Sequence, residues 1–183
     1  TKNPFDNQGG SVELTVGDYG RNEGRFYLSG NLSDTVAASI AGASIRNDGY
    51  VRDADTGRHF NNEDTKALRA KVAFTPVDGF RATLSLDHTE QDVALTLGRP
   101  MAPLIQTDLA LGPVVLHPGS SGDWNYRART SFDPPGHGQT LEHTGGSLSM
   151  EWDINSQWLF KSISSYRKLK THSFIDIDAS EYE

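Results

Sequence analysis

Cysteine is absent from the 183 residues of this chain, which excludes a disulfide framework, a thiolate metal site and a cysteine nucleophile. Long hydrophobic runs are also missing, since no stretch approaches the ~18–20 apolar residues of a membrane-spanning helix. The mean hydropathy of −0.53 is low for a membrane protein built of helices. Positive charge is outweighed: the net charge is −7 and no basic stripe offsets it, which disfavours a nucleic-acid partner.

The motifs of catalysis and metal binding are missing too. The six histidines are scattered, without the His-x-x-x-His or His-Glu-x-x-His spacing of zinc sites. The sequence holds neither a Gly-x-Ser-x-Gly elbow nor a phosphate loop ending in Gly-Lys-Ser/Thr. We therefore predict that the chain is not an enzyme and carries no metal ion or cofactor.

One acidic stretch, Asp53-Ala-Asp-Thr-Gly57, resembles a calcium-binding loop. It lacks the glycine at position six and the glutamate at position twelve of such a loop. The Asp-x-x-Gly pattern is also typical of an ordinary turn, and this interpretation is favoured.

What the sequence does contain is strict alternation of apolar and polar residues in several segments. Side chains alternate between the two faces of a strand, so each such segment has an apolar and a polar wall. The alternation predicts a shared apolar face, directed outward to lipid, and a polar face directed inward to a lumen. The first holds Phe26, Leu28, Leu68, Val72, Leu84 and Leu86, and the second holds Arg25, Arg69, Lys71 and Arg81.

These patterns predict an all-β fold, an antiparallel up-and-down meander of about seven strands. Small residues fill the third strand, whose weak alternation leaves its facing open. The expected strands are Ser11–Gly17, Arg25–Leu32, Val36–Ile45, Lys66–Phe74, Phe80–His88, Leu141–Trp152 and Gln157–Lys170.

The connections between these strands alternate in length. The turns near Ser33, Val77 and Asn155 are short, whereas Arg46–Asp64 and Glu90–Gly138 are long. Outer-membrane barrels keep short turns in the periplasm and long loops outside, so the segregation predicts that sidedness here. The second long connection is rich in proline, which indicates a structured loop with a small hairpin rather than a continuous strand.

Aromatic residues recur in these strands, and all the girdle candidates except Phe26 lie beside the short turns. They are typical of the girdle that lines a membrane interface, although the core of a soluble sandwich would also contain aromatics. The candidates for a girdle are Phe26, Phe74, Phe80, Trp152, Trp158 and Phe160.

The order of several short motifs resembles the TonB-dependent outer-membrane receptors. Thr1-Lys-Asn-Pro4 is similar to the end of their plug domain, and Gly10–Gly20 to their first barrel strand with its Gly-x-Tyr-Gly turn. Gly30–Asp34 resembles their first periplasmic turn, and Arg46–Tyr50 resembles the opening of the next outer loop. Leu159–Arg167 is similar to a strand several hairpins further along.

The resemblance implies that residues 1–10 are the end of a plug and a linker, and that residues 11–183 are part of a transmembrane barrel of about 22 strands. It implies a longer protein in the bacterial outer membrane, with lipid and lipopolysaccharide around it and the TonB energy-coupling complex as the plug's partner. Its function would be active uptake of a scarce extracellular solute, such as a siderophore, a vitamin or a saccharide. A passive porin and a soluble β-sandwich binding module remain alternatives.

One group of loop residues is a candidate ligand site. Trp124, Tyr126, Arg127 and Arg129 bring aromatic and guanidinium groups together in the longest loop. Guanidinium forks suit carboxylates and phosphates, and aromatic rings offer flat apolar contact. These four residues are therefore predicted to bind an anionic ligand; contact with lipopolysaccharide phosphates or with nearby acidic residues is the alternative.

Overall fold

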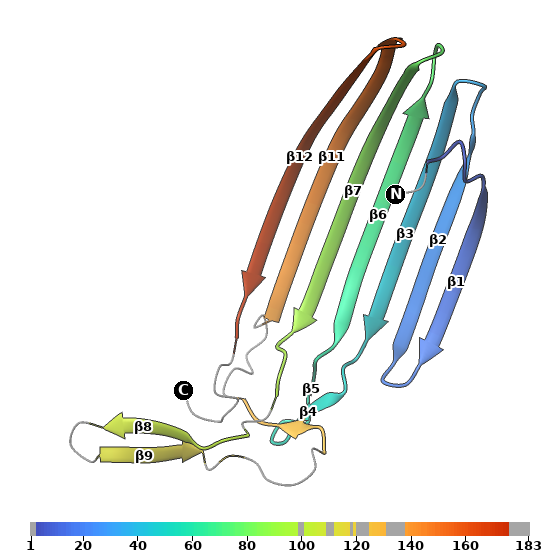
Figure 1. Ribbon diagram of the computed structural model, residues 1–183. Coiled ribbons are helices and arrows are strands. Elements are labelled where there is room, and N and C mark those ends of the chain that lie inside the picture. Colours follow the sequence, from blue (N-terminus) through green and yellow to red (C-terminus); the bar gives the residue numbers. More distant parts are fainter. Residues whose placement is uncertain are drawn as a thin grey trace.

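Seven long antiparallel strands form one sheet in the computed structural model, which describes residues 3–98, 101–108, 112–117, 119, 125–130 and 138–175. Strands adjacent in the sheet also follow one another among the long strands of the chain, so the predicted meander is confirmed (Figure 1). The strands are β1 (Gly9–Gly17), β2 (Arg21–Asn31), β3 (Val36–Asn47), β6 (Glu63–Phe74), β7 (Phe80–Ala94), β11 (Gly138–Asn155) and β12 (Trp158–Ser173). The described residues include no helix long and apolar enough to cross a membrane.

Several strands extend beyond the predicted limits. β2 begins at Arg21 rather than Arg25, and β7 continues to Ala94, so residues 90–94 belong to a strand and not to the loop. The end of β7 pairs with the start of β11, from Gly138↔Ala94 onward. Backbone groups form the ladder, so pairing continues where the apolar alternation has stopped, and the side-chain pattern underestimates strand length.

Two small sheets lie at one end of the long one (Figure 1). β8 (Leu104–Asp108) and β9 (Gly112–His117) form the predicted hairpin within the proline-rich connection. β10 (Arg127–Ala128), β4 (Val51–Asp53) and β5 (His59–Phe60) form a three-stranded sheet, in which β10 runs parallel to β4. This sheet joins two connections that lie more than sixty residues apart in the chain.

The strand register divides the long sheet into two faces. Residues that are directly opposite in an antiparallel pair share a face. Phe26 lies opposite Gly42, which lies opposite Leu68, while Arg69 lies opposite Asp87. All six predicted apolar residues therefore share one face, here called the apolar face, and the four predicted basic residues share the other, the polar face. The register also orients the third strand, whose Ile40 and Gly42 lie on the apolar face and whose Ala41 and Ala43 lie on the polar face.

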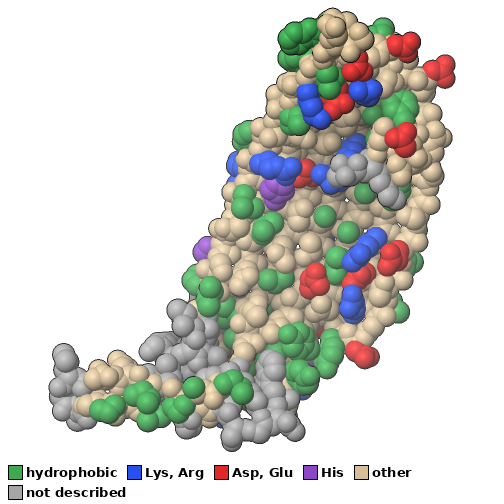
Figure 2. Space-filling view, in the orientation of Figure 1, with side chains coloured by type: hydrophobic (Ala, Val, Ile, Leu, Met, Phe, Trp, Pro, Cys, Tyr) green, Lys and Arg blue, Asp and Glu red, His purple; other side chains and the backbone are tan. Residues whose placement is uncertain are grey.

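The polar face carries most of the charged side chains of the sheet. Figure 2 shows basic and acidic groups spread along its length. The N-terminal segment lies against this face, because the Tyr27 hydroxyl donates to the Asn7 carbonyl at 3.2 Å and the Ser29 hydroxyl donates to the Pro4 carbonyl at 3.4 Å. Pro4 is fully buried there.

The apolar face is exposed, although large side chains cover it. Val12 and Leu14 expose 76% and 79% of their surface, and Leu84 exposes 43%. The Phe26 ring lies over Gly42, where a Cβ atom would come within 2.3 Å of the ring. Among the residues described, no second layer packs on this face.

The short turns all lie at one end of the sheet, and the long connections with the β1–β2 turn lie at the other (Figure 1). On the apolar face, Phe80, Trp152 and Phe160 are aligned in a row across three strands near the short turns, with Phe74 on the next strand. Toward the long connections, four charged residues form a row across four strands: Lys66, Glu90, Glu142 and Lys170.

Candidate functional site

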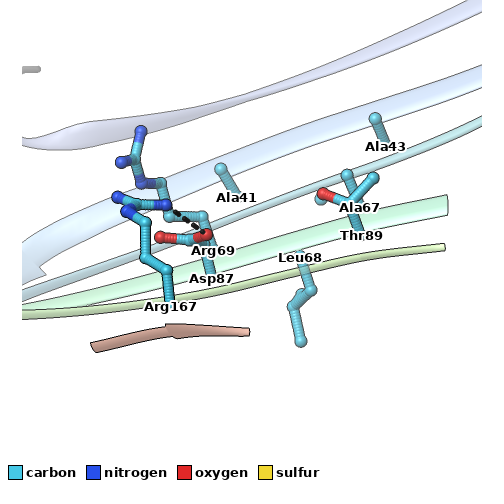
Figure 3. Close-up of a pocket in the computed structure, with 9 residues that line it drawn as sticks. Ala41, Ala43, Ala67, Leu68, Arg69, Asp87, Thr89 and Arg167 are labelled. Carbon is cyan, nitrogen blue, oxygen red and sulfur yellow. Dashed lines mark hydrogen bonds and ion pairs between the residues drawn. The ribbon is translucent and has the colours of Figure 1, made fainter. Parts of the chain in front are cut away.

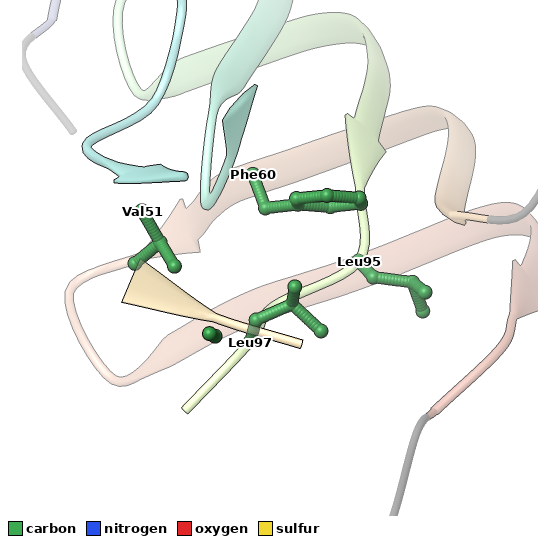
Figure 4. Packing of buried hydrophobic residues seen from close by; sticks show 5 residues of the cluster. Val51, Phe60, Leu95 and Leu97 are labelled. Carbon is green, nitrogen blue, oxygen red and sulfur yellow. The ribbon is translucent and has the colours of Figure 1, made fainter. Parts of the chain in front are cut away.

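The long connections converge on a small apolar core at their end of the sheet. Val51, Phe60, Leu95, Leu97 and Ala128 are each at most 7% exposed and pack together (Figure 4). They come from the β3–β6 connection, the segment after β7 and the short strand β10. We call residues 48–62, 95–97 and 126–129 the loop-end cap.

Backbone and amide hydrogen bonds hold the three segments of the loop-end cap in place. The Arg52 and Ala54 amides donate to the carbonyls of Tyr126 and Ala128 at 2.9 and 2.8 Å. The Asn61 side-chain amide donates to the Leu97 carbonyl at 3.0 Å, while its oxygen accepts from the Leu97 amide at 2.7 Å. Residues distant in the chain are thus fixed on one rigid surface.

Asp53 closes a turn in the loop-end cap. One carboxylate oxygen accepts from the Asp55 amide, the Thr56 amide and the Thr56 hydroxyl at 2.7–3.0 Å. The side chain is 2% exposed. This is the hydrogen-bonded Asx turn that the Asp-x-x-Gly pattern favours. No cluster of three or more potential metal ligands occurs in the described part of the chain.

Three of the four predicted ligand-binding residues lie in the loop-end cap, and Trp124 lies outside the described residues. Arg127 is in β10, opposite Arg52 of β4. The Arg129 Nε atom lies 3.3 Å from Asp55 Oδ2, so this arginine pairs with a nearby acid, as the alternative interpretation expects. Both groups of that ion pair are more than half exposed, which leaves them accessible to a ligand.

Tyr126 belongs to an aromatic row that the sequence does not reveal. Its ring meets Tyr50 edge to face at 5.9 Å, and Tyr50 meets Tyr19 in the same way at 6.5 Å. The three side chains are 44–55% exposed and come from three different connections. Tyr19 and Tyr126 both have a backbone φ angle near +60°, which residues other than glycine rarely adopt. Because all three rings are about half exposed, the row presents aromatic surface at the end of the sheet that carries the long connections.

The loop-end cap also carries arginine side chains that contact its other rings. The Arg58 guanidinium lies 5.8 Å from the centre of the Phe60 ring. His59 contacts the Gly49 carbonyl through Nδ1 at 3.1 Å and Arg52 through Nε2 at 2.9 Å. With Nδ1 as the donor, Nε2 accepts from the guanidinium. Aromatic edges and forked cations on one surface suit a ligand with flat and anionic parts.

The polar face holds groups that sequence reasoning missed. His143, treated as an isolated histidine, contacts Asp87 through Nδ1 at 3.2 Å and Arg167 through Nε2 at 3.2 Å. These residues lie on three strands, and no spacing along the chain links them. Two further ion-pair groups are Glu23 with Arg21 and Arg25, and Glu151 with Arg81 and Lys161. Glu23, Arg21 and Arg25 alternate along one strand, whereas only strand register reveals the other two clusters.

The remaining described histidine side chains have ordinary partners. His88 contacts the Thr144 hydroxyl at 2.8 Å and Glu90 at 3.1 Å. His172 packs edge to face on Phe174 at 4.8 Å. Neither arrangement holds the further ligands that a metal ion needs.

Comparison with known proteins adds no identification. The chain matches no protein-family model, and a search of curated proteins finds no match either.

Proposed function

We propose that the chain is part of the barrel wall of a TonB-dependent outer-membrane receptor, which takes up a scarce extracellular solute with energy from the TonB complex. The observation that carries this proposal is the single-layered sheet, in which the first six long strands present one exposed apolar face and one more polar face. β12 departs from the pattern, because Ser162 and Ser164 lie on the apolar face and Leu159 and Ile163 lie on the polar face. A transmembrane barrel strand has this pattern, since one side faces lipid and the other faces an aqueous or plugged lumen.

The spacing of the two residue rows on the apolar face supports the membrane assignment. Phe80 in the aromatic row and Glu90 in the charged row are ten residues apart on β7. Ten steps of about 3.4 Å, at a strand tilt of ~40°, span about 26 Å along the membrane normal. The apolar band of outer-membrane barrels is ~25 Å tall, with aromatic girdles at its borders.

Strand length and the burial of the two faces support the same assignment. The seven long strands have 9 to 18 residues, and ~9–11 suffice to cross the hydrocarbon core. Neighbours on opposite faces differ in burial: Lys71 is 9% exposed and Val72 41%, while Ser85 is 9% and Leu84 43%. Side chains are thus more crowded on the polar face, where the N-terminal segment also packs, than on the apolar face.

A soluble sandwich fits these observations less well. Its inner faces would pack against each other at about 10 Å. Val12, Leu14 and Val16 are instead 76–81% exposed, and no other described element covers them. Apolar surface of this extent on a soluble monomer would promote association.

We assign solute capture to the loop-end cap, with Tyr126, Arg127 and Arg129 as its contacts together with Trp124. This end carries the long connections, which lie outside the cell in barrels of this type. The uptake role, the energy source and the capture site rest on the resemblance of the sequence motifs in combination with this arrangement. The proposed protein is a transporter, not an enzyme.

The lipid-facing assignment is tested with the full-length protein in bilayers. The chain has no cysteine of its own, so single substitutions Leu84→Cys and Thr83→Cys place one label on each face of β7. We expect a lipid-soluble quencher to quench the label at residue 84 and not the label at residue 83. Equal quenching at both positions, or the reverse pattern, contradicts the proposed barrel wall.

The transport assignment is tested by uptake in cells with and without the TonB complex. Accumulation of labelled ferric chelates, cobalamin and oligosaccharides is measured in cells that carry the full gene. We expect one class of solute to accumulate only when the complex is present. Equal accumulation without it indicates a passive porin, and recovery of the protein in the soluble fraction indicates a binding module.

A further inference from the structure

Arg69 is the exception among the arginines that line the polar face of the long sheet. Arg21, Arg25, Arg81 and Arg167 each have an acidic partner within 3.5 Å. Arg69 makes no hydrogen bond or ion pair with any described residue, although it lies opposite Asp87 in the strand register. Asp87, the expected partner of Arg69, is therefore close to it in the sheet but forms its ion pairs with other residues.

The Asp87 side chain points away from Arg69 on β6 and toward β11 and β12. Its Oδ2 atom lies 3.2 Å from His143 Nδ1 and 3.5 Å from Arg167 Nη1. Gly145 makes this possible, because a Cβ atom there would come within 2.8 Å of the Asp87 carboxylate and 3.0 Å of the Arg167 guanidinium. The absence of a side chain at residue 145 thus leaves room for the carboxylate to reach His143 on β11 and Arg167 on β12.

The result is an excess of positive charge at this level of the sheet. The Arg69 and Arg167 guanidinium groups lie beside the single Asp87 carboxylate, Arg69 through the strand register and Arg167 through the ion pair. Figure 3 shows the guanidinium groups of Arg69 and Arg167 extending to the same side of the sheet, next to Asp87. Two guanidinium forks side by side can bind one further carboxylate with charge-assisted hydrogen bonds.

Next to these two arginines is an open pocket of about 370 Å³. Its floor consists of small side chains of β3 and β6, including Ala41, Ala43 and Ala67, and the Thr89 hydroxyl lies beside them (Figure 3). Its volume is at the lower end of small-molecule sites, which are ~300–1,000 Å³. The methyl groups offer an apolar surface for a compact carbon skeleton attached to the bound carboxylate.

We propose that Arg69 and Arg167 form a carboxylate-binding subsite on the polar face, with Asp87 and His143 holding Arg167 in position. The carboxylate comes either from a small solute or from an acidic side chain of another part of the protein that packs on this face. This subsite lies in the middle of the sheet, separate from the loop-end cap, and it does not depend on the proposed transport function.

The test uses the purified full-length protein and two probes of the same shape, isobutyrate and its uncharged amide, with binding followed by calorimetry. The variants are Arg69→Gln, Arg69→Lys and a control, Arg81→Gln, which removes another polar-face arginine, nearer the short turns, whose partners are Glu151 and Asp153. Thermal unfolding of each variant is measured in parallel.

A subsite open to solute should bind isobutyrate and not the amide. Arg69→Gln should weaken isobutyrate binding about tenfold to a hundredfold, and Arg81→Gln should leave it unchanged. Arg69→Lys, which keeps the charge and loses the fork, should fall between the wild type and Arg69→Gln.

If the protein itself supplies the carboxylate, isobutyrate should not bind, and Arg69→Gln should lower the unfolding temperature while Arg81→Gln lowers it less. The proposal is wrong if isobutyrate and the amide bind equally well. It is also wrong if Arg69→Gln and Arg81→Gln have the same effect on both binding and unfolding. Because these measurements use no energy source, they do not depend on the outcome of the uptake experiment.

Discussion

The long sheet exposes its large apolar side chains, whereas the loop-end cap buries them. Leu14, Leu28 and Leu84 on the apolar face are 43–79% exposed, whereas Val51, Leu95 and Leu97 in the loop-end cap are at most 2% exposed. The hydrophobic effect drives apolar surface away from water, so each region must find its own apolar surroundings. The apolar residues of the loop-end cap pack against one another. Those of the apolar face have no such cover among the described residues, which is why we assign the sheet to lipid.

The two regions should therefore respond differently to substitution. A cavity in the cap should disturb the cap alone, while a charge on the apolar face should disturb insertion of the whole barrel. The following predictions concern the full-length protein and proceed from the largest expected effect to the smallest.

Phe60→Ala should cost about 3–5 kcal/mol of local stability, because it removes a buried ring and leaves a cavity in the core of the loop-end cap. Hydrogen exchange should rise sharply at Val51, Leu97 and Ala128 and remain unchanged in β11. The matched control is Val77→Ala in a short turn, where the side chain is 63% exposed and little should change. Loss of the assembled barrel in Phe60→Ala would show that the two regions are not independent.

Val72→Arg should impair assembly, since an arginine at mid-membrane on the lipid face costs ~2–4 kcal/mol. The folded fraction is measured from urea titration in lipid bilayers. Thr83→Arg, on the polar face of the adjacent strand opposite Ala73, is the control and should assemble better. Similar losses for both variants would remove the distinction between the two faces.

Arg127→Ala and Arg129→Ala should each weaken capture of an anionic solute by ~1.5–3 kcal/mol, roughly tenfold to a hundredfold in affinity. Trp124→Ala should also weaken capture by removing flat apolar contact. Binding to whole cells is measured alongside surface expression, which should not change. Lys161→Ala, at the short-turn end, is the control. If all three loop variants bind normally, the capture site lies elsewhere.

Asp53→Ala should destabilise the turn that follows β4 by about 1–2 kcal/mol, because three donors lose their acceptor. Asp53→Asn keeps an acceptor oxygen and should lose less. Protease cleavage near Gly57 reports the difference on intact cells, which also tests whether this connection is extracellular. No cleavage in any variant, with cleavage at a site engineered next to Asp78, would reverse the sidedness.

The sequence predicted the elements of the sheet well where alternation was strong. The segments that contain Phe26, Val72 and Leu84 became strands whose apolar residues share one face, because the period of two and the turn residues are local properties. The limits of β7 and β11 were predicted less well, since backbone pairing with a neighbouring strand extends them beyond the patterned residues. The facing of β3 was open in the sequence, because alanine and serine discriminate little between the two sides of a sheet.

The candidate site was predicted only in part, for a related reason. The cluster around Tyr126, Arg127 and Arg129 is local in the chain and could be recognised there. Its neighbours Tyr19 and Tyr50, and the acid Asp55 that pairs with Arg129, come from other connections. The parallel pairing of β10 with β4 brings them together, and no pattern in the sequence specifies that pairing.

By itself, then, the sequence determined an all-β chain with two-faced strands and connections that alternate in length, because alternation and turn chemistry act over a few residues. The tertiary structure decided which strand residues lie opposite one another. Register placed Asp87 beside Gly145 and Arg167, so that the carboxylate turned away from Arg69. It also aligned Phe80, Trp152 and Phe160 into one row. Such contacts depend on how far each strand slides along its neighbour, and the long-range backbone ladder fixes that quantity.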